Sequence, residues 1–97
     1  MRRIRTIVKF DKRISLADKK LLIPENNTVG LIMHRIRERY IHESVTNSST
    51  AIFILFSTDL EQRMFPTNAT MGEISNSLGS PTMIQIDVAI ENTFGCS

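Results

Sequence analysis

Gly95 is the residue whose type and position best suit chemistry, because it lies in a short tail, residues 91–97, beyond the last apolar segment. Glycine has no Cβ, so its carbonyl group can enter a narrow cleft that would exclude any other residue. A protease that cuts after Gly95, and then an enzyme that activates its carboxyl group, would both need this property. The alternative is an ordinary frayed terminus, since chain ends are often poorly ordered. Apolar residues alternate with other residues over 82–90, which predicts a core strand directly before the tail. This favours a short extended tail that is accessible at the edge of the folded domain.

The other candidates for catalysis or metal binding are scattered along the chain. The nucleophiles and bases form no set, and no Gly-rich phosphate loop follows a predicted strand, so we expect that the protein is not an enzyme. His34 and His42 lie eight residues apart with no carboxylate or cysteine spaced to join them, which favours surface histidines over metal ligands. The single cysteine, Cys96, excludes an internal disulfide and a thiolate cluster. We therefore expect no metal and no cofactor.

Composition and charge narrow the class of protein. Ninety-seven residues suit one domain, and without a long apolar run or a signal-like start we expect a cytoplasmic protein. Residues 1–39 carry eleven of the twelve basic residues and four acidic ones, a net +7, whereas residues 40–97 carry Arg63 and six acidic residues, a net −5. The N-terminal part is a candidate surface for acidic partners, and its alternative is a solvated face. Nucleic acid is disfavoured, because no stacking aromatics or reading motif accompany the charge.

Hydrophobic periodicity predicts an α+β fold. Alternating or continuous apolar segments predict four strands, and one apolar stripe at helical spacing predicts a main helix over residues 28–41, with Thr28 as its N-cap. The strands are expected at residues 4–10, 20–23, 51–56 and 84–90, and 51–56 is expected to be central because it is apolar throughout. Thr70 and Glu73 form a capping box that opens a short second helix over residues 71–78. This order predicts a ubiquitin-like β-grasp domain, residues 1–90, with a four-stranded mixed sheet and a flexible tail, residues 91–97.

Several short motifs resemble one known family. They are Pro66–Gly72 (Pro-Thr-Asn-Ala-Thr-Met-Gly), Lys20–Pro24, Thr28–Gly30, Ile36–Arg39 and the tail Glu91–Gly95. Together and in this order they are similar to the autophagy-related protein eight family of ubiquitin-like modifiers, which includes GABARAP and light chain three. The resemblance runs from about Ile4 to Gly95.

The resemblance implies a conjugation pathway. A dedicated cysteine protease would cut the bond between Gly95 and Cys96 and would grip Phe94 beside it. Activating and conjugating enzymes would then join Gly95 to phosphatidylethanolamine, which would bring the cytoplasmic protein to the autophagosome membrane.

The resemblance also implies that cargo receptors and adaptors bind through short hydrophobic and acidic peptides that pair with the second strand. Lys20 and Leu22 would line a first pocket with Met83 near it. A second pocket would be lined by Leu21, Ile23, Pro24, Ile32 and Ile36, with Arg39 at its rim. The alternative is that Leu22, Ile32 and Ile36 belong to the core.

Three residues depart from the family pattern. Leu21 replaces an aromatic residue, Glu38 replaces a basic one, and Ser75 stands where tyrosine is common. Two other interpretations stay open: a relative of the autophagy-related protein twelve, which is conjugated to proteins, and a β-grasp peptide-binding module that is never conjugated.

Both alternating sets of the segment 51–56 are apolar, yet the main helix can cover only one face of the sheet. The family covers the other face with two helices before the first strand, and here only residues 1–3 precede that strand. We therefore expect an apolar patch on the helix-free face that supports self-association.

Overall fold

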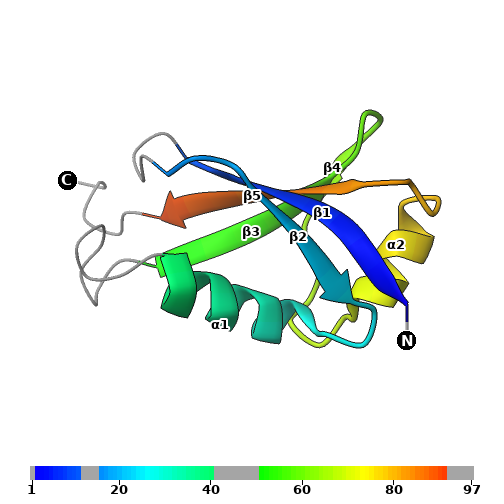
Figure 1. The fold of residues 1–97 in the computed structure, drawn as a ribbon, viewed down its shortest axis with the longest axis horizontal. Coiled ribbons are helices and arrows are strands. Elements are labelled where there is room, and N and C mark those ends of the chain that lie inside the picture. The colour runs from blue at the N-terminus through cyan, green and yellow to red at the C-terminus, as the bar shows by residue number, and fades with distance from the viewer. Residues whose placement is uncertain (1, 12–15, 41–50, 92–97) are drawn as a thin grey trace.

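The computed structural model describes residues 2–11, 16–40 and 51–91, which form five strands and two helices (Figure 1). In chain order the elements are β1 Arg3–Phe10, β2 Lys19–Pro24, α1 Val29–Tyr40, β3 Ala51–Ser57, β4 Gln62–Arg63, α2 Met71–Ser77 and β5 Ile84–Glu91. The predicted α+β class is confirmed, but the prediction of four strands is wrong. The fifth strand, β4, has only two polar residues, so no hydrophobic period marks it. Within the described part of the chain, no helix is both long and apolar enough to cross a membrane.

The five strands form one mixed sheet in the order β2-β1-β5-β3-β4. β1 runs antiparallel to β2 and parallel to β5, so the first and last strands lie side by side. The middle of the sheet is therefore β5. The expectation that the apolar segment 51–56 is central is wrong, since β3 lies one place nearer the edge and pairs with β4 only at Phe56 and Ser57.

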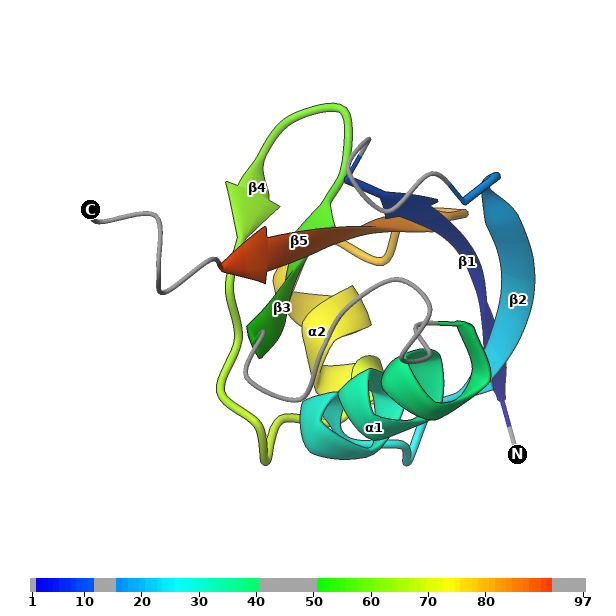
Figure 2. The ribbon, with the colours of Figure 1, turned by 90° about the vertical axis from the view of Figure 1, so that its left-hand side faces the viewer.

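Both helices lie against the same concave face of the sheet (Figure 2). The side chains of this face form the core together with the apolar stripe of α1 and the buried side of α2. Its least exposed apolar residues are Val8, Phe56, Met71, Ile74, Ile84 and Ile86. The one buried polar side chain of β1, Thr6, donates its hydroxyl to the carbonyl oxygen of Ile4 at 3.1 Å, so its burial leaves no hydrogen-bonding group unsatisfied.

Helix α1 begins as the sequence predicts. The hydroxyl of Thr28 accepts a hydrogen bond from the backbone N–H of Leu31 at 3.2 Å, which is the N-cap geometry. The helix covers Val29–Tyr40 of the predicted 28–41, and residue 41 lies outside the described residues. Its stripe places Val29, Ile32 and Ile36 in the core. The opposite side therefore stays available to solvent.

A backbone clasp, formed between residues 25–30 and 67–72, holds the start of α1 against the start of α2. The N–H groups of Val29 and Gly30 donate to carbonyl oxygens of Ala69 and Thr67, and those of Met71 and Gly72 donate back to Asn27 and Glu25, all within 2.8–3.0 Å. A Cβ on Gly72 would lie 3.3 Å from the Glu25 carbonyl oxygen, so a larger residue would strain this contact. The motif Pro66–Gly72 thus fixes where α1 begins.

Helix α2 opens with the predicted capping box. The Thr70 hydroxyl accepts from the N–H of Glu73, and the Glu73 carboxylate accepts from the N–H of Thr70 at 2.8 Å. The helix ends at Ser77, one residue before the predicted end, and Gly79 follows at φ 83°. Ser75, which replaces a tyrosine of the resembled family, is buried in this helix.

The helix-free face of the sheet is only partly apolar. Ile7, Phe53, Leu55 and Ala89 lie on it half-buried, among the charged and polar side chains of the same strands. Asp87 on this face accepts hydrogen bonds from Ser57 at 3.1 Å, Gln62 at 2.9 Å and Gln85 at 2.6 Å, so its charge is well compensated within the protein. Self-association through this face stays a prediction.

Candidate functional site

Strand β2 is an edge of the sheet, and half of its backbone groups point away from the protein. In an antiparallel pair, hydrogen-bonded and non-hydrogen-bonded residue pairs alternate. The N–H of Glu25 donates to the carbonyl oxygen of Arg2 at 3.0 Å, which makes this a hydrogen-bonded pair and sets the alternation along the ladder. The backbones of Lys20 and Leu22 therefore face the open edge. Such an edge can accept an added strand.

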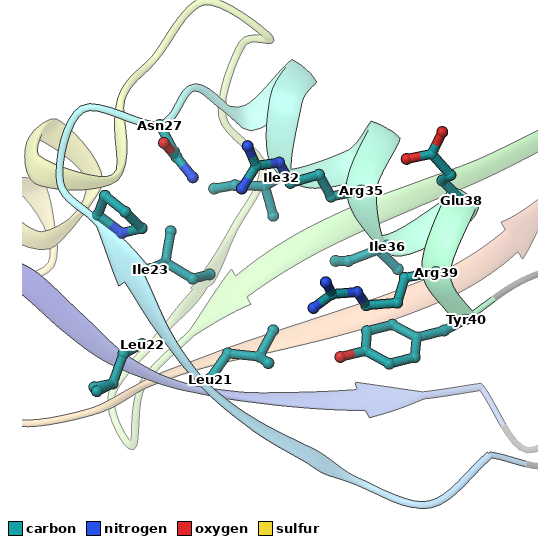
Figure 3. Close-up of a pocket in the computed structure, with 11 residues that line it drawn as sticks. Leu21, Leu22, Ile23, Asn27, Ile32, Arg35, Ile36, Glu38, Arg39 and Tyr40 are labelled. Carbon is teal, nitrogen blue, oxygen red and sulfur yellow. The ribbon is translucent and has the colours of Figure 1, made fainter.

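The inner groove lies between β2 and α1, and its hollow is about 240 Å³ (Figure 3). Ile23, Ile32 and Ile36 form its floor, but they are core residues with 6%, 3% and 2% of their surface exposed. The alternative that Leu22, Ile32 and Ile36 belong to the core is therefore correct for the bulk of Ile32 and Ile36, whose outer atoms alone are open to a ligand, and wrong for Leu22, which is 59% exposed. The half-buried Leu21 and Pro24 form the β2 side, and the remaining lining residues are Leu22, Asn27, Arg35, Glu38, Arg39 and Tyr40.

The outer groove lies on the opposite side of β2, on the helix-free face, and its more open hollow is about 580 Å³. Leu22 and Met83 are exposed at 59% and 46% and provide its apolar surface, whereas Arg5 and Lys20 provide positive charge. Arg5 lies directly opposite Leu22 in the β1–β2 register. Thr6 and Leu21 complete the lining. Side chains of an added strand would alternate between the inner and outer grooves.

All nine residues predicted for peptide binding lie at these two grooves. Lys20, Leu22 and Met83 line the outer groove, as predicted for the first pocket. The predicted second pocket corresponds to the inner groove, which contains Leu21, Ile23, Pro24, Ile32, Ile36 and Arg39. The structure thus brings together residues from β2, α1 and the segment before β5.

Sequence reasoning missed several lining residues. Arg35 could have been found, because it lies one helical turn before Arg39 on a predicted helix. Arg5 could be placed at the outer groove only from the register between β1 and β2, which the sequence alone does not reveal. Tyr40 packs against the core at the end of the groove, and its ring lies 5.8 Å edge-on from that of Phe10 and 5.7 Å from the Lys19 ammonium nitrogen.

The predicted conjugation site lies outside the described residues. Phe94, Gly95 and Cys96 belong to the segment 92–97, and β5 continues to Glu91, just past the predicted boundary at residue 90. Among the described residues, no group of three His, Cys, Asp or Glu side chains could hold a metal ion.

The fold and the grooves define a small α+β protein with an open, basic sheet edge. Comparisons with known proteins give information on the fold alone. No family model matches the chain. No curated protein matches it either. The chain is similar to an Arabidopsis thaliana protein solved by NMR spectroscopy with evolutionary couplings, with a TM-score of 0.59, 15% identity, and 95% of this chain and 90% of that chain covered.

A second similar structure comes from work on molecular mimicry of SUMO in DNA repair, with a TM-score of 0.48, 17% identity, and 95% and 94% of the two chains covered. A TM-score below 0.5 does not establish a shared fold. The Arabidopsis similarity concerns the fold alone.

Proposed function

We propose that this protein is a ubiquitin-like modifier of the autophagy-related protein eight type, which recruits partners by pairing its β2 edge with short extended peptides. One observation carries the proposal: an open strand edge lies between two grooves lined by the nine residues that the sequence resemblance implies. Main-chain hydrogen bonds to Lys20 and Leu22 would provide affinity, and the two grooves would provide specificity.

The sheet order and the helix positions support the β-grasp assignment. Parallel β1 and β5 lie next to each other, β2 and β3 flank them, and α1 crosses the concave face (Figure 1). The motif Pro66–Gly72 contributes to this framework through the backbone clasp, so the motif that carries most of the resemblance also has a structural purpose.

Conjugation through Gly95 is the part of the proposal that rests on the tail sequence, Thr93-Phe94-Gly95-Cys96-Ser97. A protease would remove Cys96 and Ser97, and enzymes of activation and conjugation would join Gly95 to phosphatidylethanolamine at the autophagosome membrane. Glycine suits both steps, because its carbonyl carbon is not shielded by a side chain.

Intact mass measurement tests the conjugation. After incubation of the full chain with a cell extract, loss of Cys96 and Ser97 is expected, and the chain ending at Gly95 is expected to become attached to phosphatidylethanolamine liposomes in the presence of activating and conjugating enzymes. Attachment to protein lysines instead would support the relative of the autophagy-related protein twelve. An unchanged mass would support a module that is never conjugated.

A further inference from the structure

We propose that two copies of this protein associate by placing the hairpin tip of one copy, the turn Thr58–Glu61 between β3 and β4, in the outer groove of the other. The tip carries an exposed leucine between two acidic residues, and the outer groove carries apolar surface beside two basic residues. This inference goes beyond the proposed function and does not depend on it, because neither conjugation nor a peptide on β2 enters the argument.

The first observation is that exposed apolar residues gather at two places on the sheet. In the part of the chain that the structure describes, five large hydrophobic residues are exposed. Leu22 and Met83 line the outer groove. Leu60, with 92% of its surface exposed, lies in the hairpin tip, and Met64 directly follows β4. Single exposed apolar residues are common on protein surfaces, but two such groups on one molecule can cover each other.

The hairpin tip is held in a defined shape without a partner. The N–H of Thr58 donates to the carbonyl oxygen of Glu61 at 2.8 Å, and the N–H of Leu60 donates to the Thr58 hydroxyl at 3.2 Å. At the base of the turn, the hydroxyl of Ser57 donates to Asp87 on β5 at 3.1 Å. A turn that is already ordered loses little conformational entropy when it docks. Leu60 is therefore presented to solvent on a preorganised support.

Charges of opposite sign lie beside the two apolar groups. Asp59 and Glu61 of the hairpin tip are exposed, and so are Arg5 and Lys20 of the outer groove. Glu61 lies 3.6 Å from the guanidinium group of Arg63, which compensates part of its charge. We therefore assign the main contact with the basic groove residues to Asp59. Complementary charges of this kind orient two surfaces as they meet.

The hairpin tip cannot reach the outer groove of its own chain. The groove lies at β2 and the tip lies between β3 and β4, and β2 and β4 are the opposite edges of the sheet (Figure 2). Four strand spacings separate these edges, about 19 Å in all. The turn is too short to cross that width. The occupant must then be the tip of a second copy, and every copy carries both surfaces.

The contact is small, and this determines how it should behave. One turn in one groove buries less than the roughly 1,200 Å² of a standard interface, so we expect weak association that depends on concentration. Where the proposed peptide binding also holds, a second copy and a peptide on β2 exclude each other from the outer groove.

Three matched leucine-to-aspartate variants of the full chain test the contact by sedimentation equilibrium. Leu60→Asp disables the tip, Leu22→Asp disables the groove, and Leu31→Asp on α1 is the control with the same charge change. The average mass of the parent and of the control should rise with concentration toward about 1 mM. The tip and groove variants should associate about tenfold more weakly or less. Thermal melting checks that each variant is folded, and Arg5→Glu replaces Leu22→Asp if that variant unfolds.

A mixture of the two disabled variants identifies the surfaces. The reporter is ¹⁵N-labelled Leu60→Asp, which keeps its groove, and the titrant is unlabelled Leu22→Asp, which keeps its tip. The resonances of Arg5 and Met83 in the reporter should shift along a saturating curve. A titrant that carries both substitutions should leave them unchanged. Adding Asp59→Asn to the Leu22→Asp titrant should weaken binding about two- to fivefold, and high salt should remove that difference.

The outcomes separate this inference from the proposed function. A parent chain that stays monomeric at the highest concentration refutes the contact. Association of Leu60→Asp equal to that of the parent also overturns it, because the copies then meet through another surface. Equal shifts with the titrant that lacks both surfaces lead to the same conclusion. None of these results bears on peptide binding by β2 or on conjugation, which a peptide titration and the intact mass measurement test separately.

Discussion

Replacing Leu22 with proline should block pairing at the β2 edge while leaving the domain folded. The backbone N–H of Leu22 faces the open edge, so proline removes a donor that none of the five described strands uses. Proline is tolerated on edge strands in this orientation. Its ring would also project into the position of an added strand, which removes hydrogen bonding and close approach together.

The stability cost can be worked out from exposure. Leu22 keeps 59% of its surface in water, so its apolar contribution is well below the roughly 1.5–3 kcal/mol of a fully buried leucine, about 1 kcal/mol. For a domain of this size, a loss of that order lowers the Tm by about 4–8 °C. The matched control is Leu21→Pro, whose lost N–H belongs to the ladder with Thr6. It should cost about 1–3 kcal/mol for the carbonyl group left unpaired, in addition to the lost contacts of the half-buried side chain.

Circular dichroism melting and peptide titration measure both expectations. Loss of one net hydrogen bond corresponds to about 0.5–1.5 kcal/mol, and with the steric effect of the ring Leu22→Pro should weaken a β2-binding peptide about tenfold or more. A folded Leu22→Pro variant that binds the peptide as well as the parent would refute strand pairing. Equal melting temperatures for the two proline variants would refute the alternation assigned to β2.

Three other changes test separate parts of the molecule. Gly95→Ala should block processing and conjugation with no change in melting, because the tail is expected to lie outside the core, and normal lipid attachment of this variant in the liposome assay would contradict the tail hypothesis. Arg39→Glu should weaken an acidic peptide about fivefold or more at low ionic strength and little at high salt, with unchanged melting; identical isothermal titration curves for variant and parent would remove Arg39 from the site. Thr70→Ala should cost about 1 kcal/mol and lower the Tm by about 4–8 °C through loss of the α2 cap, with peptide affinity preserved; an unaltered Tm would mean that the capping box adds nothing to stability.

The sequence predicted those parts of the fold that side-chain types encode. The stripe of α1, the caps at Thr28 and Thr70, and the alternation of β1 and β5 all appear in the structure close to their predicted bounds. Strand β4 was missed because Gln62 and Arg63 are polar and exposed, so only main-chain pairing to β3 defines it. Because residues 51–56 are apolar throughout, the sequence predicted that their strand lies at the centre of the sheet. In the structure β5 occupies the central position.

Only part of the candidate site could be predicted from the sequence. The alternation in Lys20–Ile23 agrees with part of the division between the outer and inner grooves, because only the outer groove contains Lys20 and only the inner groove contains Ile23, whereas Leu21 and Leu22 line both grooves and Pro24 departs from the alternation. Arg5 and Met83 reach the outer groove only through pairing of distant strands, which a local pattern cannot reveal. The backbone clasp could not be predicted either, because backbone carbonyl and N–H groups form its hydrogen bonds whatever the side chains are. Only at Gly72 does the clasp restrict the residue type, since a Cβ there would lie close to the Glu25 carbonyl oxygen.

The parallel pairing of β1 with β5 has a kinetic consequence. It joins Thr6 to Ile84, residues near opposite ends of the described chain, so this contact closes a very large loop. Such contacts form late and slow the folding of a domain. Until β5 docks, β1 and β3 each expose an unpaired edge rich in isoleucine and phenylalanine, which is a hazard for aggregation. Substitutions in β5 that delay docking should therefore lower the soluble yield of the protein by more than their effect on the free energy of unfolding alone predicts.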